Sequence, residues 1–412
     1  MSRRTYLGRV LVVAFAITST IAGCHSSTEF DRASSYPTVL SAIGSGREVI
    51  LPYTSISGLI VLRTQLNGQD SCAMILDSGF PYTLVSTDRL DTACFRIGPV
   101  WQEAMPGGDV EINRVYDITI HVGGISITAD SLRGFRLAGL EPMIGNRMDG
   151  IVGHDFFETY VVTVDYENEV ITLRDPDGFA YTGNGEIVDV TIESGEVFIV
   201  GEVQHPDGTW RKAKLKLDTG SADIIGFNGS FIQSESLLHE SQPRLAQLGF
   251  AVGGETQNWV TRLSRFRVGG VIFERPVVGY SVDTRRGGDA GTIGAGFLSR
   301  FTAIFDYARK RIILEPNSRI QESFDYDMSG CFVSCVPPDF GGKQVIAVTP
   351  GTPAHTAGIQ PGDLILEVDD QEASAYSITE LRALLSRAGP VKLRIEHDGK
   401  TSDVVLELRP LI

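Results

Sequence analysis

The sequence predicts a mainly β protein that consists of two repeated halves and a smaller C-terminal domain. Short runs of Val, Ile, Leu, Thr and Phe alternate with Gly, Asn and Asp turns along most of the chain, which is typical of strands. An Asp-Ser/Thr-Gly motif occurs at 77–79 and again at 218–220, 141 residues later. Each motif is followed by an apolar pair and a glycine, at 151–153 and 292–294, with the same separation. Landmarks repeated in the same order indicate a duplicated unit.

The first residues resemble a targeting segment rather than part of the fold. Three arginines surround the start of an apolar stretch at 10–21, which is shorter than the roughly 20 residues that a membrane-spanning helix needs. This pattern predicts a secretory signal peptide over 1–23. The sequence at 21–24 resembles the bacterial lipobox, which implies lipidation of Cys24; an ordinary signal peptide is the alternative. We therefore expect an extracytoplasmic protein, lipid-anchored to a bacterial membrane, with 24–48 as a polar tether.

The charge balance restricts the possible partners. The formal net charge is −15, and it becomes −18 without residues 1–23, because that segment holds three arginines and no acidic residue. A chain with this negative charge is not expected to bind nucleic acid or an anionic membrane surface. Membrane attachment would therefore depend on the lipid. The seven histidines are scattered, and no motif has the spacing of a metal site. We expect neither a metal nor an organic cofactor.

Four cysteines remain besides Cys24. Cys72 and Cys94 flank the first Asp motif, and outside the cytoplasm we expect them to be the pair that forms a disulfide. Cys331 and Cys335 are four residues apart in an expected strand, which is too far for a bridge.

The composition changes at the end of the second repeat. We expect one half at 49–182, the other at 183–318 and the C-terminal domain at 325–412. In that domain a helix is predicted over 377–387, where Ser377 and Glu380 have the spacing of a capping box.

The string PGTPAHTAGIQPGDLIL at 350–366 closely resembles the PDZ domains of bacterial proteases. The resemblance implies that an extended peptide adds as a strand and that backbone N–H groups hold its C-terminal carboxylate. The alternative is a domain that packs on the rest of the chain as a rigid appendage. The residues expected to form the peptide groove are Gly330, Cys331, Phe332, Ile378, Leu381 and Leu385.

The repeated halves resemble the retropepsin-like and pepsin-like aspartic peptidases, most of all bacterial members with two such halves in one chain and a PDZ domain. The family motif is an apolar pair, then Asp-Ser/Thr-Gly-Ala/Ser, with a later apolar pair and glycine. The resemblance implies a bilobal acid-protease fold, active as a monomer, with Asp77 and Asp218 as the catalytic pair. Ser78 and Thr219 would hydrogen-bond across the axis between the halves.

The chemistry of such a pair follows from electrostatics. Two adjacent carboxylates cannot both ionise cheaply, so they share one proton. The ionised carboxylate takes a proton from water, while the protonated one donates to the carbonyl oxygen that is attacked. The two roles belong to the coupled pair. Gly79 and Gly220 allow tight turns whose N–H groups reach the carboxylates. Ser221 fits the family motif, whereas Phe80 departs from it and either forms a pocket wall or crowds the pair.

Two glycine-rich turns lie where flaps are found in retropepsins. A flap needs glycine for hairpin freedom and apolar tips that exclude water. An ordinary surface hairpin is the alternative. The flap candidates are Met105, Gly107, Gly108, Gly253 and Gly254.

Taken together, these features predict an aspartic endopeptidase whose PDZ domain binds substrate or partner peptides, including protein C-termini. The alternative is a non-catalytic peptide-binding scaffold, which Phe80 favours. A PDZ-coupled serine protease is not expected, since the sequence has neither a Ser-His-Asp arrangement nor a G-x-S-x-G elbow.

Overall fold

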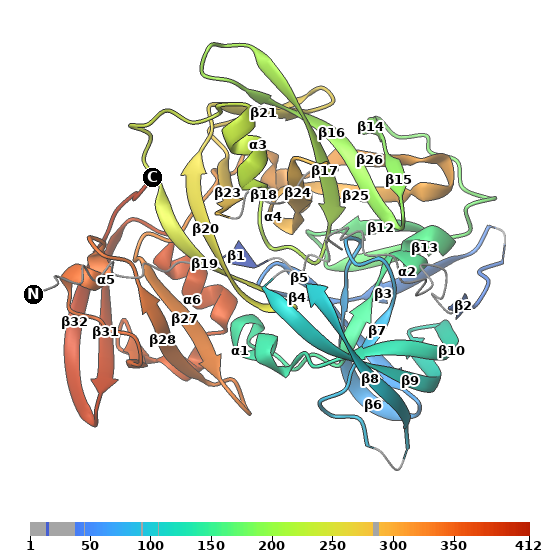
Figure 1. Cartoon of the computed structure of the whole chain (residues 1–412), viewed down its shortest axis with the longest axis horizontal. Coiled ribbons are helices and arrows are strands. Elements are labelled where there is room, and N and C mark those ends of the chain that lie inside the picture. The colour runs from blue at the N-terminus through green and yellow to red at the C-terminus, as the bar shows by residue number, and fades with distance from the viewer. Residues whose placement is uncertain (1–13, 16–37, 45, 92–93, 106, 283–287) are drawn as a thin grey trace, which may run out of the picture.

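The computed structural model describes residues 14–15, 38–44, 46–91, 94–105, 107–282 and 288–412. It is mainly β and bilobal, with the C-terminal domain at one side of the two lobes (Figure 1), so the predicted fold class is confirmed. Cys24 and most of the predicted signal peptide lie outside the described residues. No helix in the described part of the chain is long and apolar enough to cross a membrane.

The first half is built on a mixed sheet in which the strand before Asp77 is central. Its order is β2-β10-β7-β11-β6-β5-β9-β8, and β4 pairs with β5. The strands are β2 (Val39–Leu40), β4 (Thr54–Ile56), β5 (Leu59–Leu66), β6 (Gln69–Leu76), β7 (Leu84–Ser86), β8 (Arg96–Met105), β9 (Gly108–Val122), β10 (Ile125–Phe135) and β11 (Gly150–Val152). Two short helices belong to this half, α1 (Glu141–Ile144) and α2 (His154–Thr159).

The second half repeats the central pairing of the first. In both halves the strand before the Asp motif pairs in parallel with the later apolar-glycine strand, β6 with β11 and β17 with β24. The strands are β15 (Thr191–Glu193), β16 (Glu196–Gln204), β17 (Trp210–Asp218), β18 (Ile225–Phe227), β19 (Leu245–Ala251), β20 (Gly254–Arg262), β21 (Arg265–Val268), β22 (Val271–Glu274), β23 (Val277–Ser281) and β24 (Gly291–Gly294). The sheet also includes β1 (Ala14–Phe15), and the helices of this half are α3 (Gly229–Ser234) and α4 (Ala295–Leu298).

A third sheet joins the halves, and its centre marks the axis between them. Its order is β14-β26-β25-β12-β13-β3, so three strands come from each side. Thr163 pairs with Ile304, its counterpart 141 residues later, and Val162 and Val164 pair with Phe305 and Ala303. The two halves are therefore related by a pseudo-twofold axis at this pair. The strands are β3 (Glu48–Pro52), β12 (Val161–Asp165), β13 (Val170–Arg174), β14 (Glu186–Asp189), β25 (Phe301–Asp306) and β26 (Arg311–Pro316).

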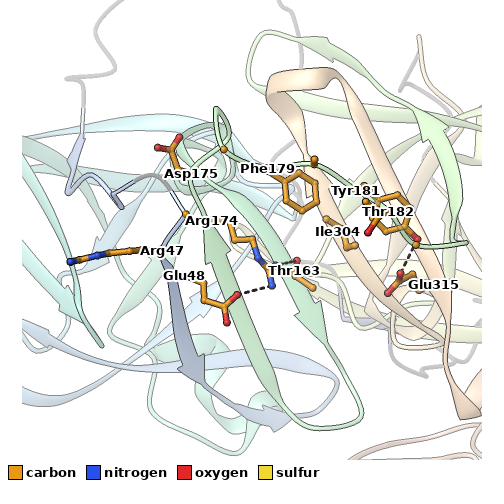
Figure 2. Close-up of a pocket in the computed structure, with 14 residues that line it drawn as sticks. Arg47, Glu48, Thr163, Arg174, Asp175, Phe179, Tyr181, Thr182, Ile304 and Glu315 are labelled. Atoms are coloured by element: carbon orange, nitrogen blue, oxygen red, sulfur yellow. Dashed lines mark hydrogen bonds and ion pairs between the residues drawn. The ribbon is translucent and has the colours of Figure 1, made fainter.

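A hollow lies beside this shared sheet. It is lined by the segment that joins the two halves, at 178–183, and by sheet residues that include Thr163 and Ile304. Figure 2 shows Arg174 paired with Glu48 at 2.8 Å, and the Tyr181 hydroxyl donating to Glu315 at 2.8 Å. None of the site residues expected from the sequence lines this hollow. This hollow is therefore separate from the Asp motifs.

The C-terminal domain has its own core beneath a sheet of order β27-β28-β29-β31-β32. The predicted capping box is present at the start of α6, where the Ser377 hydroxyl accepts from the Glu380 N–H and Glu380 accepts from the Ser377 N–H. The elements are β27 (Cys331–Val336), β28 (Gly342–Val348), α5 (Pro353–Thr356), β29 (Leu364–Val368), β30 (Gln371–Glu372), α6 (Ile378–Leu385), β31 (Gly389–His397) and β32 (Lys400–Leu408).

Two expectations need correction. The expected disulfide between Cys72 and Cys94 is wrong: Cys72 is a buried thiol and Cys94 an exposed one. The end of the expected tether belongs to the fold, because Val39–Leu40 pairs with β10 and the Thr38 hydroxyl donates to Asp155.

Candidate active site

The two Asp motifs meet at the axis between the halves. Asp77 follows β6, Asp218 ends β17, and both are fully buried. The strands β11 and β24 lie behind them: Asp77 donates its N–H to the Val152 carbonyl at 2.9 Å, and Asp218 pairs with Gly294. The parallel pairing thus fixes where each strand ends and places both aspartates at one point.

Each carboxylate lies against the glycine of the opposite motif. A Cβ atom on Gly79 would stand 2.7 Å from Asp218 Oδ1, and one on Gly220 would stand 2.7 Å from Asp77 Oδ1. Real Cβ atoms do not approach so closely, so both positions require glycine. The two motifs are therefore packed directly against each other.

Backbone donors orient both carboxylates in the same way. Asp77 Oδ1 accepts from the N–H groups of Gly79 at 2.8 Å and Phe80 at 3.0 Å. Asp218 Oδ1 accepts from the Gly220 N–H at 3.0 Å. Neither Oδ2 atom has a hydrogen-bond partner among the described residues. Both Oδ2 atoms are buried against the glycine of the opposite motif.

A reciprocal set of hydrogen bonds locks the two motifs together. The Ser78 N–H donates to Thr219 Oγ1 at 2.9 Å, and the Thr219 N–H donates to Ser78 Oγ at 3.1 Å. Both hydroxyls then donate to carbonyls across the axis, Ser78 to Leu217 at 3.2 Å and Thr219 to Leu76 at 2.8 Å. All four bonds are buried, so the relative position of the aspartates is fixed.

Burial and mutual repulsion keep a proton on the pair. Burial is the largest cause that raises the pKa of each carboxyl, and the negative charge of Asp218 further raises the pKa of Asp77. These are the conditions under which two carboxylates share one proton.

Lys216 is a site residue that the sequence reasoning missed. Its buried ammonium lies 4.0 Å from Asp218 Oδ2 and donates to the Gly79 carbonyl at 3.3 Å. Glu196 lies on its other side at 3.5 Å. The positive charge of Lys216 lowers the pKa of both aspartates and so opposes the effect of burial. A lysine in an apolar strand, where the first repeat has Ile75, was the available signal.

The ring of Phe80 packs in the core while its backbone N–H still donates to Asp77 Oδ1. Its ring is fully buried and packs edge-on against Tyr82 at 5.2 Å and Phe135 at 5.9 Å. It belongs to one apolar cluster with Met105 and Phe250, which come from the two glycine-rich hairpins. The ring is therefore part of a buried apolar cluster and does not form a pocket wall.

The two glycine-rich hairpins meet at their tips. The first joins β8 to β9, and the second joins β19 to β20. Gly107 stands so close to Gly254 that a Cβ on it would lie 2.6 Å from the Gly254 carbonyl oxygen. Both residues have φ in the left-handed region, 96° and 117°, which favours glycine. An ordinary surface hairpin, which was the alternative, would not make such a contact with a second hairpin.

The expected groove residues of the C-terminal domain are buried, but they do not all come together. Cys331, Ile378, Leu381 and Leu385 belong to the core of this domain, whereas Phe332 packs in the cluster that contains Phe250. Gly330 precedes β27 with φ at 70°, and its N–H donates to Asp327 Oδ2 at 2.7 Å.

Comparison with known proteins identifies the C-terminal domain. Residues 344–396 match the family model described as PDZ domain, so this part of the chain is a PDZ domain. A search of curated proteins finds no match. Among solved structures, an aspartic proteinase from Irpex lacteus is similar at a TM-score of 0.44 and 16% identity, over 68% of this chain and 100% of that one.

Replacing Thr219 with valine is expected to lower the free energy of unfolding by about 1–3 kcal/mol, because it leaves the buried Ser78 N–H and Leu76 carbonyl without partners. Chemical denaturation measures the loss. Thr219→Ser keeps the hydroxyl and is the matched control, with a smaller expected loss. A loss in Thr219→Val that is no larger than the loss in Thr219→Ser would contradict the expected contribution of the hydrogen bonds.

Proposed function

We propose that this chain is an aspartic-type endopeptidase that hydrolyses peptide bonds with water activated by Asp77 and Asp218. The observation that carries the proposal is the symmetric pair of buried carboxyls, each oriented by backbone N–H groups and each packed against the glycine of the opposite motif. A purely structural pair of acids has no need of such an arrangement, since burying two carboxyls side by side costs stability.

In the proposed mechanism, the pair holds one proton when substrate arrives. The ionised carboxylate accepts a proton from water as the water oxygen attacks the scissile carbonyl carbon. The protonated carboxyl donates to the carbonyl oxygen, so the charge that develops there is neutralised within a buried site. The proton taken from water then goes to the leaving nitrogen as the C–N bond breaks, while a hydroxyl of the tetrahedral intermediate returns its proton to the other carboxylate, so the pair again holds one proton. The hairpin tips at Gly107 and Gly254 would cover the bound chain and exclude bulk water.

The other parts of the chain complete the proposal. PDZ domains bind extended peptides, so this domain would hold substrate or partner chains, including protein C-termini. Because one chain supplies both aspartates, a monomer would be active. We also propose extracytoplasmic attachment to a bacterial membrane through a lipid on Cys24.

The rival function is non-catalytic peptide binding by the same two halves. It is favoured by Phe80, which stands where the family motif has Ala or Ser.

Asp77→Asn and Asp218→Asn are each expected to reduce cleavage of an unfolded protein by at least about 10²-fold, because neither variant can both accept and donate the proton. Residues 25–412 would be assayed from acid to neutral pH, with product fragments identified by mass spectrometry. Asp189→Asn, at an exposed position of β14, is the matched control and should cleave like the original chain. Peptide binding without cleavage at any pH would favour the rival function.

Lys216→Ile is expected to move the whole pH–rate profile of cleavage to higher pH. Removal of the positive charge takes away an influence that lowers both aspartate pKa values, so the shared proton is held to higher pH. Isoleucine is chosen because the first repeat carries it at the equivalent position, Ile75. Lys212→Ile, on an exposed part of the same strand, should leave the profile unchanged. A profile unmoved by Lys216→Ile would mean that the ammonium does not act on the pair.

A further inference from the structure

The peptide groove of the PDZ domain is bordered by β27 and α6, and the first half lies against it. In Figure 1, α1 lies beside α6 and β27. A Cβ on Gly145, which follows α1, would stand 3.0 Å from Cys335 Sγ and 2.8 Å from Ile378 Cγ2. Both contacted residues are buried, one on each border of the groove. The backbone after α1 therefore fills the space between the strand and the helix.

Arg382 of α6 ties this segment to the groove. Its guanidinium donates to the Met143 carbonyl at 3.0 Å and to the Val333 carbonyl of β27 at 3.2 Å. A third bond reaches Ser57 Oγ at 3.1 Å. Burial lowers the pKa of Arg382 to about 10. One side chain thus bridges the strand that would receive a peptide and the segment that lies against it.

A second tie comes from the turn between β4 and β5. The Ser57 N–H donates to Thr379 Oγ1 at 2.8 Å, at the start of α6. The first turn and the middle of α6 are therefore held to the first half by hydrogen bonds, at Thr379 and at Arg382.

The loop expected to hold a peptide carboxylate already holds one from its own chain. Asp327 Oδ1 accepts from the Ser329 N–H at 3.2 Å, and Asp327 Oδ2 accepts from the Gly330 N–H at 2.7 Å. The Cys331 N–H donates to Ser329 Oγ at 3.0 Å. The three N–H groups at the start of β27 are thus all engaged within the domain.

The closed groove is also connected to the second hairpin. Phe332 of β27 stacks on Phe250 of β19 with ring centroids 5.8 Å apart. Phe250 and Val252 belong to the same apolar cluster as Met105 at the first hairpin. A shift of β27 would therefore act on the hairpin whose tip meets Gly107.

We propose that the PDZ groove is closed by its own chain: Met143–Gly145 occupies the peptide position, Asp327 occupies the carboxylate position, and an extended peptide binds only by displacing them. Displacement would release Phe332 from Phe250 and loosen the hairpin of β19 and β20. The inference rests on the peptide-binding role proposed above for this domain. It makes the PDZ domain a regulated one, with the first half as its resident ligand.

The test uses the reactivity of Cys335, which is buried beneath Gly145, with the exposed Cys94 as internal reference. Residues 25–412 are treated with N-ethylmaleimide, and the labelling rate of each cysteine is followed by peptide mapping. We expect Cys335 to react at least about 100-fold more slowly than Cys94, and Arg382→Met to raise the Cys335 rate about tenfold by favouring local opening. Arg394→Met, which removes an exposed arginine of β31 elsewhere in the domain, should leave the rate unchanged.

Thr379→Val is the second variant, since it removes only the bond from Ser57 and retains the side-chain shape. A smaller rise in Cys335 labelling is expected. Cys335 reacting as fast as Cys94 in the original chain, or staying protected in both variants, would overturn the closed groove. Labelling needs no catalysis, so this outcome is independent of whether the chain cleaves peptides.

Hydrogen exchange of residues 245–262 in the same variants tests the link to the hairpin. Faster exchange in Arg382→Met than in Arg394→Met is expected, because the stacking of Phe332 on Phe250 is lost. Unchanged exchange together with faster Cys335 labelling would overturn the link between groove and hairpin.

Discussion

The structure depends on holding two buried carboxyl groups together. Asp77 and Asp218 repel each other when ionised, and burial raises their pKa values further. Such a pair is stable only if the interactions around it outweigh the repulsion between the carboxylates and the cost of burying them. The reciprocal bonds of Ser78 and Thr219, together with two glycines against the carboxylates, provide that constraint. The packing of both halves thereby offsets the free energy that is lost when the pair is buried.

The duplicated architecture explains how the pair is placed. Each half ends a central strand at its aspartate, and a shared sheet with Thr163 and Ile304 at its centre brings the halves into register. The symmetry is then broken by single residues. Lys216 stands where the first half has Ile75, so only one side of the pair lies next to a positive charge. The electrostatic asymmetry of the pair is a property of that one substitution.

The repeat made the class of fold, the aspartates and the hairpins predictable from sequence, because each appears twice at a constant spacing. The PDZ string made the third domain equally clear. Contacts between domains carry no such periodic signal, so the position of α1 against the PDZ groove was beyond sequence reasoning. The same holds for Lys216, because lysines also stand at 212 and 214 and the strand pattern gives neither its burial nor its partner. The disulfide expected between Cys72 and Cys94 was wrong, because flanking a motif in sequence does not bring two side chains together.

The central claim is that Asp77 and Asp218 form one proton-sharing site. It is tested most directly by a crystal structure of residues 25–412 with a statine-type peptide, whose hydroxyl imitates the attacking water. The account predicts that this hydroxyl lies between the two carboxylates within hydrogen-bonding distance of both Oδ2 atoms, with the hairpin tips closed over the peptide. A peptide bound away from the pair, or a hydroxyl in contact with only one carboxyl, would contradict it.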